Sequence, residues 1–254
     1  MGGVKVMGNP ISRDWSLLPT PAPESIAMDL VMDEDGLQTL LIDVDNHRYW
    51  AKQLGTSPEI LTAVFMSLPD AEEIKFVSMD LNVHRIRAVQ KCLPNAVIEV
   101  NPYFVLQRLD WCMEKVRRAE AGKLLAMAFS DQPSALLPID APTRIAFEKC
   151  IRPSDEVDVM HRSGHLFDGH RGRLTANMRH TTEFLLGRLP LFSEVNELSQ
   201  KIRQLYSCEV SPAVAKALLK QWLGELSDEA LALIRPFAAS VCDCMPNICV
   251  YWLR

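Results

Sequence analysis

Residues 74–90 read IKFVSMDLNVHRIRAVQ, a buried-strand pattern that passes directly into a helix pattern. The apolar run from Ile74 to Met79 predicts a strand, and the run stops at a carboxylate, Asp80. Two interpretations of Asp80 are open. Its side chain caps the following helix by accepting from the backbone N–H of Val83, or it is half of a metal site whose other half lies elsewhere in the chain.

On the N-terminal side, the sequence predicts three strands joined by short turns. SIAMDLVM (25–32) and LQTLLIDVD (37–45) flank a turn at Asp33–Gly36 and read as a hairpin. HRYWAKQL (47–54) follows as a third strand, and a helix begins at Ser57 with proline at its first position. After the opening stretch, whose helix ends near Cys92, AVIEV (96–100) predicts a fifth strand. The order β-β-β-α-β-α-β is that of a ribonuclease-H-like sheet, so the predicted fold class is α/β with a mixed sheet.

Beyond Asn101 the apolar period becomes helical, as Val105, Leu109, Cys112 and Val116 show. We therefore expect a long all-helical insertion after the sheet. The expected division is an irregular lead-in (1–24), a partial ribonuclease-H-like core (25–122) and a helical insertion region (123–254). Helices are expected at 103–122, 143–150, 175–187, 192–207, 211–224 and 228–253, and four tryptophans are expected in the core: Trp50, Trp111, Trp222 and Trp252.

Composition narrows the class of protein. No apolar run reaches the roughly 18–20 residues that cross a bilayer, so no membrane partner is expected. Seven cysteines scattered through apolar segments favour reduced thiols and a cytoplasmic location. Cys242, Cys244 and Cys249 cluster, but they lack a partner pair or a nearby histidine, and core packing is the favoured interpretation over zinc. A net charge of −5 argues against a surface that grips nucleic acid everywhere.

A second carboxylate lies in the first predicted strand. Asp29 interrupts the apolar run IAMDLVM, and an ionised carboxylate inside a sheet is costly unless it is paired or bound to a cation. An edge strand with Asp29 in water is the alternative. In the predicted layout the first and fourth strands are neighbours, so Asp29 and Asp80 could meet. Two such acids repel unless a cation lies between them, and paired Mg²⁺ ions held by acids cleave phosphodiesters.

The block from Ile74 to Arg118, together with IAMD (26–29), LIDVDNHRYWAKQL and LPDAEEIKFVSMD, resembles the core of DDE transposases of the insertion-sequence L-three type. LSQKIRQLYSCEVSPAVAKALLKQWLGEL resembles that family's helical insertion. The resemblance implies DNA cleavage and strand transfer with Mg²⁺ or Mn²⁺, with Asp29 and Asp80 as catalytic metal ligands. It also implies transposon-end DNA as a partner, with a transposase homo-oligomer as a further option.

The chain departs from the family pattern in several places. Leu30 and Asn101 stand where the family carries acids, and Phe104 stands where the family has histidine. The family's third acid, its zinc-binding region and its helix-turn-helix region are not found. We therefore expect a transposase truncated at both ends, with little or no transposition by this chain alone. Substitution of the missing acid by a glutamate of the helical region (Glu194, Glu197, Glu225 or Glu229) is not favoured, because a solvated helix face is the default interpretation.

Basic residues suggest where DNA would lie. His161–His180 is the one clearly basic stretch, and Arg162, Arg171, Arg173 and Arg179 are weak candidates for phosphate contacts. This stretch has two alternative interpretations. It is a solvated loop, or it binds a metal ion through His161, His165 and His170. Further phosphate candidates are Arg85, Arg87, Lys115, Arg117 and Arg118. The competing function is a non-catalytic protein that binds DNA or an intact transposase.

Overall fold

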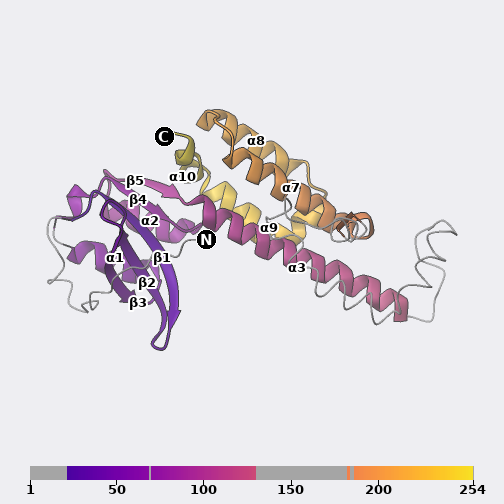
Figure 1. The fold of residues 1–254 in the computed structure, drawn as a ribbon, viewed down its shortest axis with the longest axis horizontal. Helices are drawn as coiled ribbons and strands as arrows, with labels where there is room; N and C mark the ends of the chain where they lie inside the picture. The colour runs from indigo at the N-terminus through magenta and orange to yellow at the C-terminus, as the bar shows by residue number, and fades with distance from the viewer. Residues whose placement is uncertain (1–21, 69, 130–181, 184–185, 254) are drawn as a thin grey trace. The chain divides into compact units, whose positions relative to one another are not determined.

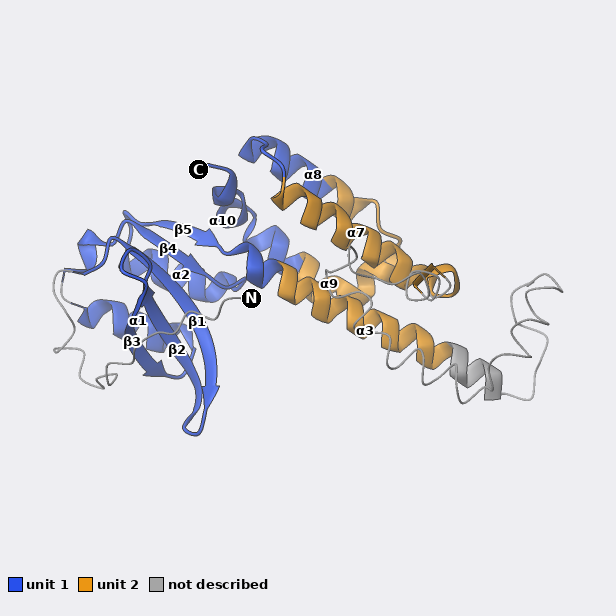
Figure 2. Cartoon of the chain, in the orientation of Figure 1, with its two compact units in different colours: residues 1–105, 208–220, 239–254 blue, residues 106–207, 221–238 orange. Residues whose placement is uncertain are grey.

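The structure is a computed structural model that describes residues 22–68, 70–129, 182–183 and 186–253. The chain forms two compact units, coloured separately in Figure 2. Unit 1 contains residues up to Val105 together with 208–220 and 239–254, and unit 2 contains residues 106–207 and 221–238. Each unit therefore combines segments that are distant in the sequence.

Unit 1 is built on a five-stranded mixed sheet with the order β3-β2-β1-β4-β5. The strands are β1 (Ser25–Asp33), β2 (Gly36–Asp43), β3 (Arg48–Leu54), β4 (Phe76–Met79) and β5 (Val97–Val100). β1, β2 and β3 pair antiparallel, whereas β4 runs parallel to both β1 and β5. The predicted fold class, strand order and central place of the first and fourth strands are confirmed.

Two helices cover one face of this sheet, as Figure 1 shows. α1 (Pro58–Ser67) and α2 (Val83–Cys92) pack against one another, and a short 3-10 turn, η2 (Ala71–Glu73), leads into β4. Both begin with a side-chain cap: Ser57 accepts from the backbone N–H of Ile60, and Asn82 accepts from those of His84 and Arg85. Their apolar faces are buried because each helix carries large apolar side chains at helical spacing, for instance Leu61 and Phe65 in α1.

The β1–β2 hairpin turns at Asp33–Gly36, as the sequence predicted. Asp33 pairs with Gly36, so Glu34 and Asp35 form the two-residue loop. Gly36 has φ of +115°, a backbone conformation that side chains rarely adopt, which explains the glycine. The Asp33 carboxylate accepts from the Asp35 backbone N–H and from Gln38 Nε2, and it forms an ion pair with Lys52 of β3. The hairpin is thus tied to its neighbouring strand.

The C-terminal end of the chain contacts the sheet of unit 1. The predicted single helix 228–253 is wrong: α9 (Asp228–Asp243) ends at Cys244, and α10 (Met245–Cys249) and the 3-10 turn η6 (Val250–Leu253) follow. Pro246 lies in the first turn of α10, where its missing N–H costs nothing, so it starts a new helix there. α10 and η6 contact β5, and Asn247 Nδ2 donates to the Ile98 carbonyl over 3.0 Å.

Unit 2 is helical. It contains most of α3 (Pro102–Phe129), α7 (Pro190–Tyr206) and portions of α8 (Pro212–Gly224) and α9. The buried face of α3 carries Val105, Leu109, Cys112 and Val116, the residues whose period predicted the helix. The helix expected at 143–150 and most of the one at 175–187 lie outside the described residues. Trp50 and Trp252 are buried as expected, but Trp111 is 60% exposed, so its assignment to the core is wrong.

Candidate metal-ligand site in unit 1

Asp29 lies in β1, and Asp80 follows directly after β4, the neighbouring parallel strand. The β1–β4 ladder pairs Ser25 with Phe76 and ends with Ala27 opposite Ser78. Continuing this register by two residues places Asp80 opposite Asp29, on strands about 4.8 Å apart. The sequence argument that the two acids could meet therefore has the topology it needs.

Asp80 does not cap the helix that follows it. The N-cap of α2 is Asn82, whose Oδ1 lies 3.1 Å from the His84 nitrogen and 3.2 Å from the Arg85 nitrogen. One of the two interpretations left open by the sequence is thereby removed. The Asp80 carboxylate instead forms an ion pair with a side chain of the first helical turn.

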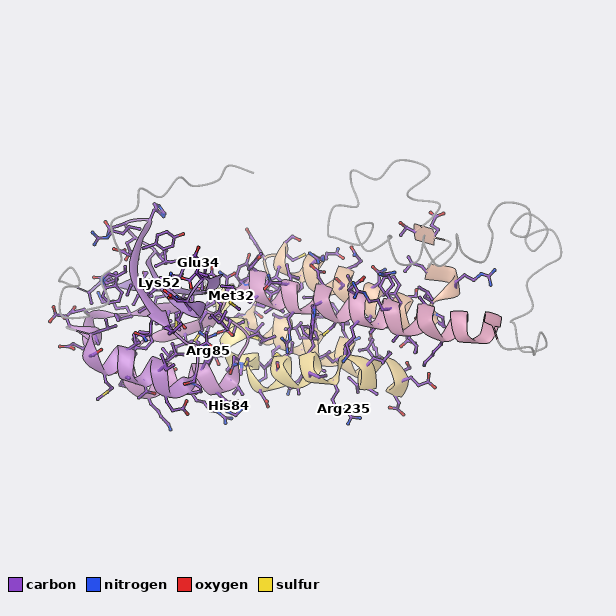
Figure 3. The ribbon with its side chains drawn as sticks, turned by 90° about the horizontal axis from the view of Figure 1, so that it is seen from below. Met32, Glu34, Lys52, His84, Arg85 and Arg235 are labelled. Carbon is purple, nitrogen blue, oxygen red and sulfur yellow. The ribbon has the colours of Figure 1, made fainter. Side chains whose placement is uncertain are left out.

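That partner is Arg85. Its Nη1 lies 2.9 Å from Asp80 Oδ1, and the two side chains are 4% and 17% exposed respectively. Figure 3 shows Arg85 on the side of α2 toward the strands, whereas His84 points away. Arg85 is therefore buried beside the acid and unavailable for phosphate contacts, a role that the sequence had allowed. Arg87, two residues on, is exposed.

Asp29 lies in a central strand, not at an edge, because β1 is paired on both sides. Its side chain is half-buried, and its Oδ1 accepts from the backbone N–H of the next residue, Leu30, over 2.7 Å. β1 is therefore not an edge strand, although its ladder with β4 ends at Ala27, two residues before Asp29. In each of the two carboxylates, Oδ1 therefore already contacts a donor of the protein: the Leu30 N–H for Asp29 and the Arg85 guanidinium for Asp80.

The third strand of this row carries an amide. The β4–β5 ladder ends with Met79 opposite Val100, so Asn101 follows opposite Asp80. Asn101 Oδ1 accepts from the Tyr103 backbone N–H over 2.9 Å at the start of α3. Two residues earlier, Glu99 is buried opposite Ser78. Sequence reasoning missed Glu99, although a glutamate inside the apolar strand AVIEV was the available signal.

The segment between α9 and α10 lies near Asp80. Burial is the main cause that raises the pKa of the Cys244 thiol to about 11, and the negative charges of Asp243 and Asp80 add to this effect. The positive charge of Arg87 lowers the pKa and only partly offsets them. Cys244 and Cys249 are buried, whereas Cys242 is exposed. Two of these three cysteines therefore pack inside the protein, as the sequence favoured, and Cys244 is held as a neutral thiol.

The donor set can be tested against the metal centre that the resemblance implies. Within the described part of the chain, no group of three His, Cys, Asp or Glu side chains is placed to hold a metal ion. Of the two acids, Asp80 already forms an ion pair with the buried Arg85, whose Nη1 lies 2.9 Å from Asp80 Oδ1. A divalent ion needs several oxygen ligands that are not neutralised in this way. The residues described here therefore do not fit the two-ion centre.

The other predicted site residues fall into two groups. Arg162, Arg171, Arg173 and Arg179 lie outside the described residues, as do His161, His165 and His170. The glutamates considered as substitutes are mostly engaged within unit 2: Glu194 accepts from the Ser227 N–H and hydroxyl, Glu197 pairs with Lys201, and Glu225 pairs with Lys201 and accepts from Gln221.

Comparison with known proteins identifies the family of the chain. Residues 30–254 match the family model of transposases of the DDE, insertion-sequence L-three type. The resemblance stated from the sequence is therefore confirmed, and it covers most of the chain. No curated protein and no solved structure matches. In the described residues, no helix is long and apolar enough to cross a membrane.

Proposed function

Because the chain belongs to the DDE transposase family of the insertion-sequence L-three type, we propose that it derives from an enzyme that cuts and joins DNA at transposon ends with Mg²⁺ or Mn²⁺. Asp29 and Asp80 occupy the positions of two metal ligands of that ancestor. This chain on its own does not cleave or join DNA. Its place in the cytoplasm, expected from its reduced cysteines, is part of the same proposal.

One observation carries this proposal: the β1–β4 register, continued by two residues beyond its last pair, brings the two acids opposite one another, but the second is paired with Arg85. The alignment supports descent from a metal-dependent enzyme, because parallel neighbouring strands bring both acids to one edge of the sheet. The ion pair supports loss of activity, because the Arg85 guanidinium already occupies Oδ1 of Asp80, one of the two oxygens that a metal ion could bind.

A strand-transfer assay tests it. Purified protein is incubated with double-stranded DNA carrying the ends of related insertion sequences, in Mg²⁺ and separately in Mn²⁺, and joined products are counted by sequencing. We expect no joining above the level of Asp80→Asn. Joining by the unchanged chain that disappears in Asp80→Asn would overturn the proposal.

A second candidate function is non-catalytic DNA binding, and the outer face of α3 favours it. Arg108, Trp111, Lys115 and Arg118 recur at helical spacing on the side opposite the buried residues. The Arg108 guanidinium lies 5.1 Å from the centre of the exposed Trp111 ring, a cation–π contact. Cations along one exposed helix face, with an aromatic ring between them, suit a phosphate backbone.

The acids of this part of α3 are paired with other groups. Asp110 pairs with Arg203, Glu114 is bound by Arg117 and Arg118, and Glu120 accepts backbone N–H groups of α7. Arg117 is buried in this pairing and cannot contact phosphate. Because the carboxylates are used inside the unit, Arg108 and Lys115 are left as the exposed charges of the outer face.

Binding to a labelled DNA duplex, measured by fluorescence anisotropy at several salt concentrations, tests this second function. Arg108→Glu with Lys115→Glu should weaken binding and flatten its salt dependence by about one to two phosphate contacts. Lys216→Glu with Lys220→Glu, on α8, makes the same change of charge elsewhere and should weaken binding less. Equal loss in both double variants would reject the α3 face.

The other non-catalytic function is binding to an intact transposase or to a second copy of the chain. Sedimentation with and without transposase detects it.

A further inference from the structure

We propose that Arg85 has replaced the metal ion as the counter-cation of Asp80, so that this site keeps its aligned acids together without divalent metal. The inference rests on the proposed function, which assigns Asp29 and Asp80 to ancestral ligand positions. It adds a new state of the site, in which Arg85 is the resident cation.

The local structure fixes Arg85 in this place. Asn82 caps α2 and so sets where the helix begins, directly after the Asp80 strand end. Arg85 is the third helical residue, one turn from the cap, and its side chain reaches back to Asp80 with 2.9 Å between Nη1 and Oδ1. The cap therefore positions the arginine, and the arginine positions the acid.

Burial makes this pairing hard to exchange. Arg85 is 4% exposed, and within the described residues its Nε and Nη2 have no hydrogen-bond partner. If a divalent ion took Asp80, the guanidinium would be left as a buried charge without compensation, which is strongly unfavourable. Metal binding to this chain therefore has to overcome the loss of the ion pair as well as dehydration of the ion.

The charges around the site support the same conclusion. Two aligned carboxylates without a cation would repel one another. With Arg85 in place, the formal charge of Asp29, Asp80 and Arg85 together is that of a single carboxylate. Asp243 and Arg87, which both act on the nearby Cys244, add one charge of each sign. These five groups together therefore carry a formal charge of −1.

Thermal unfolding in EDTA separates this state from an empty metal site, because the two predict opposite signs. In an empty metal site, Asp80→Asn relieves repulsion and raises Tm. In the site proposed here, Asp80→Asn leaves Arg85 buried and unpaired, and Tm should fall by about 5–10 °C. Asp29→Asn, the matched control on β1, should shift Tm by no more than about 2 °C. A rise in Tm for Asp80→Asn would overturn the proposal.

Calorimetry with Mn²⁺ provides the second test. The unchanged chain should show no saturable binding. Arg85→Met, which keeps the length of the stem and removes the charge, should bind Mn²⁺ at least about tenfold more tightly. This gain should vanish when Asp80→Asn is added. Arg85→Lys, which keeps the charge, should resemble the unchanged chain.

The outcomes distinguish this inference from the proposed function. Saturable Mn²⁺ binding to the unchanged chain that is lost in Asp80→Asn would overturn the role of Arg85, even if no DNA is joined. The same holds if folded Arg85→Met gains no binding. Joining of DNA by the unchanged chain would instead overturn the proposed inactivity. If Arg85→Met does not fold, the sign of the Asp80→Asn shift in Tm decides.

Discussion

The Glu120 carboxylate of α3 accepts a 2.6 Å hydrogen bond from the backbone N–H of Phe192, 72 residues farther along the chain. Its other oxygen accepts from the Leu191 N–H over 3.1 Å. The N-cap residue of α7, Leu189, has no side-chain oxygen to offer, so a buried acid from another helix caps α7 instead. This contact joins two helices of unit 2.

Glu120→Gln should therefore destabilise unit 2. The variant loses the charge at the helix N-terminus and one of two acceptors, and we expect a loss of about 2–3 kcal/mol in the free energy of unfolding. Urea unfolding followed by circular dichroism measures it. Glu194→Gln is the matched control, because Glu194 also accepts from the N-terminus of a helix, at Ser227, but near solvent. Equal losses in the two variants would contradict the importance of burial at Glu120.

Asn82 offers a test of which residue caps α2. Asn82→Ala should lower the free energy of unfolding by about 1 kcal/mol, because the His84 and Arg85 N–H groups lose their acceptor. Asn82→Asp should be close to neutral, since aspartate caps equally well. Thermal unfolding of both variants checks this. If Asn82→Ala were neutral, capping by Asp80, the alternative that the sequence allowed, would return.

Much of unit 1 could be predicted because its patterns are local. Apolar runs bounded by turns predict the strands, and a β-β-β-α-β order brings the first and fourth strands together, so the alignment of Asp29 with Asp80 followed from topology. The helix break at Cys244 was missed, although Pro246 marks it: proline is tolerated in a first turn and disfavoured in a helix interior.

The ion pair between Arg85 and Asp80 could not be predicted from the apolar period of α2. Which side chain reaches Asp80 depends on how α2 is oriented after its cap. A residue in the first turn of a helix that follows a strand can reach back to the strand end, and only the position of the cap shows which residue does so. The assignment of Trp111 to the core was wrong for a different reason. It lies off the face defined by Leu109, Cys112 and Val116, so the helical period itself indicated exposure, and aromatic character alone was misleading.

The cysteines near the C-terminal end should differ sharply in reactivity. Cys244 is buried with a pKa of about 11, whereas Cys242 is exposed. Because the thiolate is the reactive form, the raised pKa alone slows Cys244 by about a hundredfold at pH 8, and burial slows it further. Iodoacetamide labelling of the native protein, read by peptide mass spectrometry, should modify Cys242 and spare Cys244. Similar labelling of both in the native state, as expected in urea, would contradict the packing of this segment.

Asp43 should make stability depend on pH in acid. Burial raises the pKa of this carboxyl, but hydrogen bonds from the Asn46 N–H and side chain, together with Arg48, outweigh burial and lower the pKa below its ordinary value of 3.8. A lowered pKa in the folded state stabilises the protein above about pH 4, and this contribution is lost as the pH falls through the folded-state value.

Asp43→Asn should accordingly cost about 2 kcal/mol at pH 7 and progressively less below pH 4, because the unchanged protein then loses the same contribution. Urea unfolding at pH 7, 4 and 3 measures the difference between the two proteins. Arg48→Ala removes the donor whose Nε lies 2.9 Å from Asp43 Oδ2, so its acid transition should move to higher pH. A difference between the unchanged protein and Asp43→Asn that stays constant or grows toward pH 3 would show that Asp43 is not stabilised as a carboxylate in the folded chain.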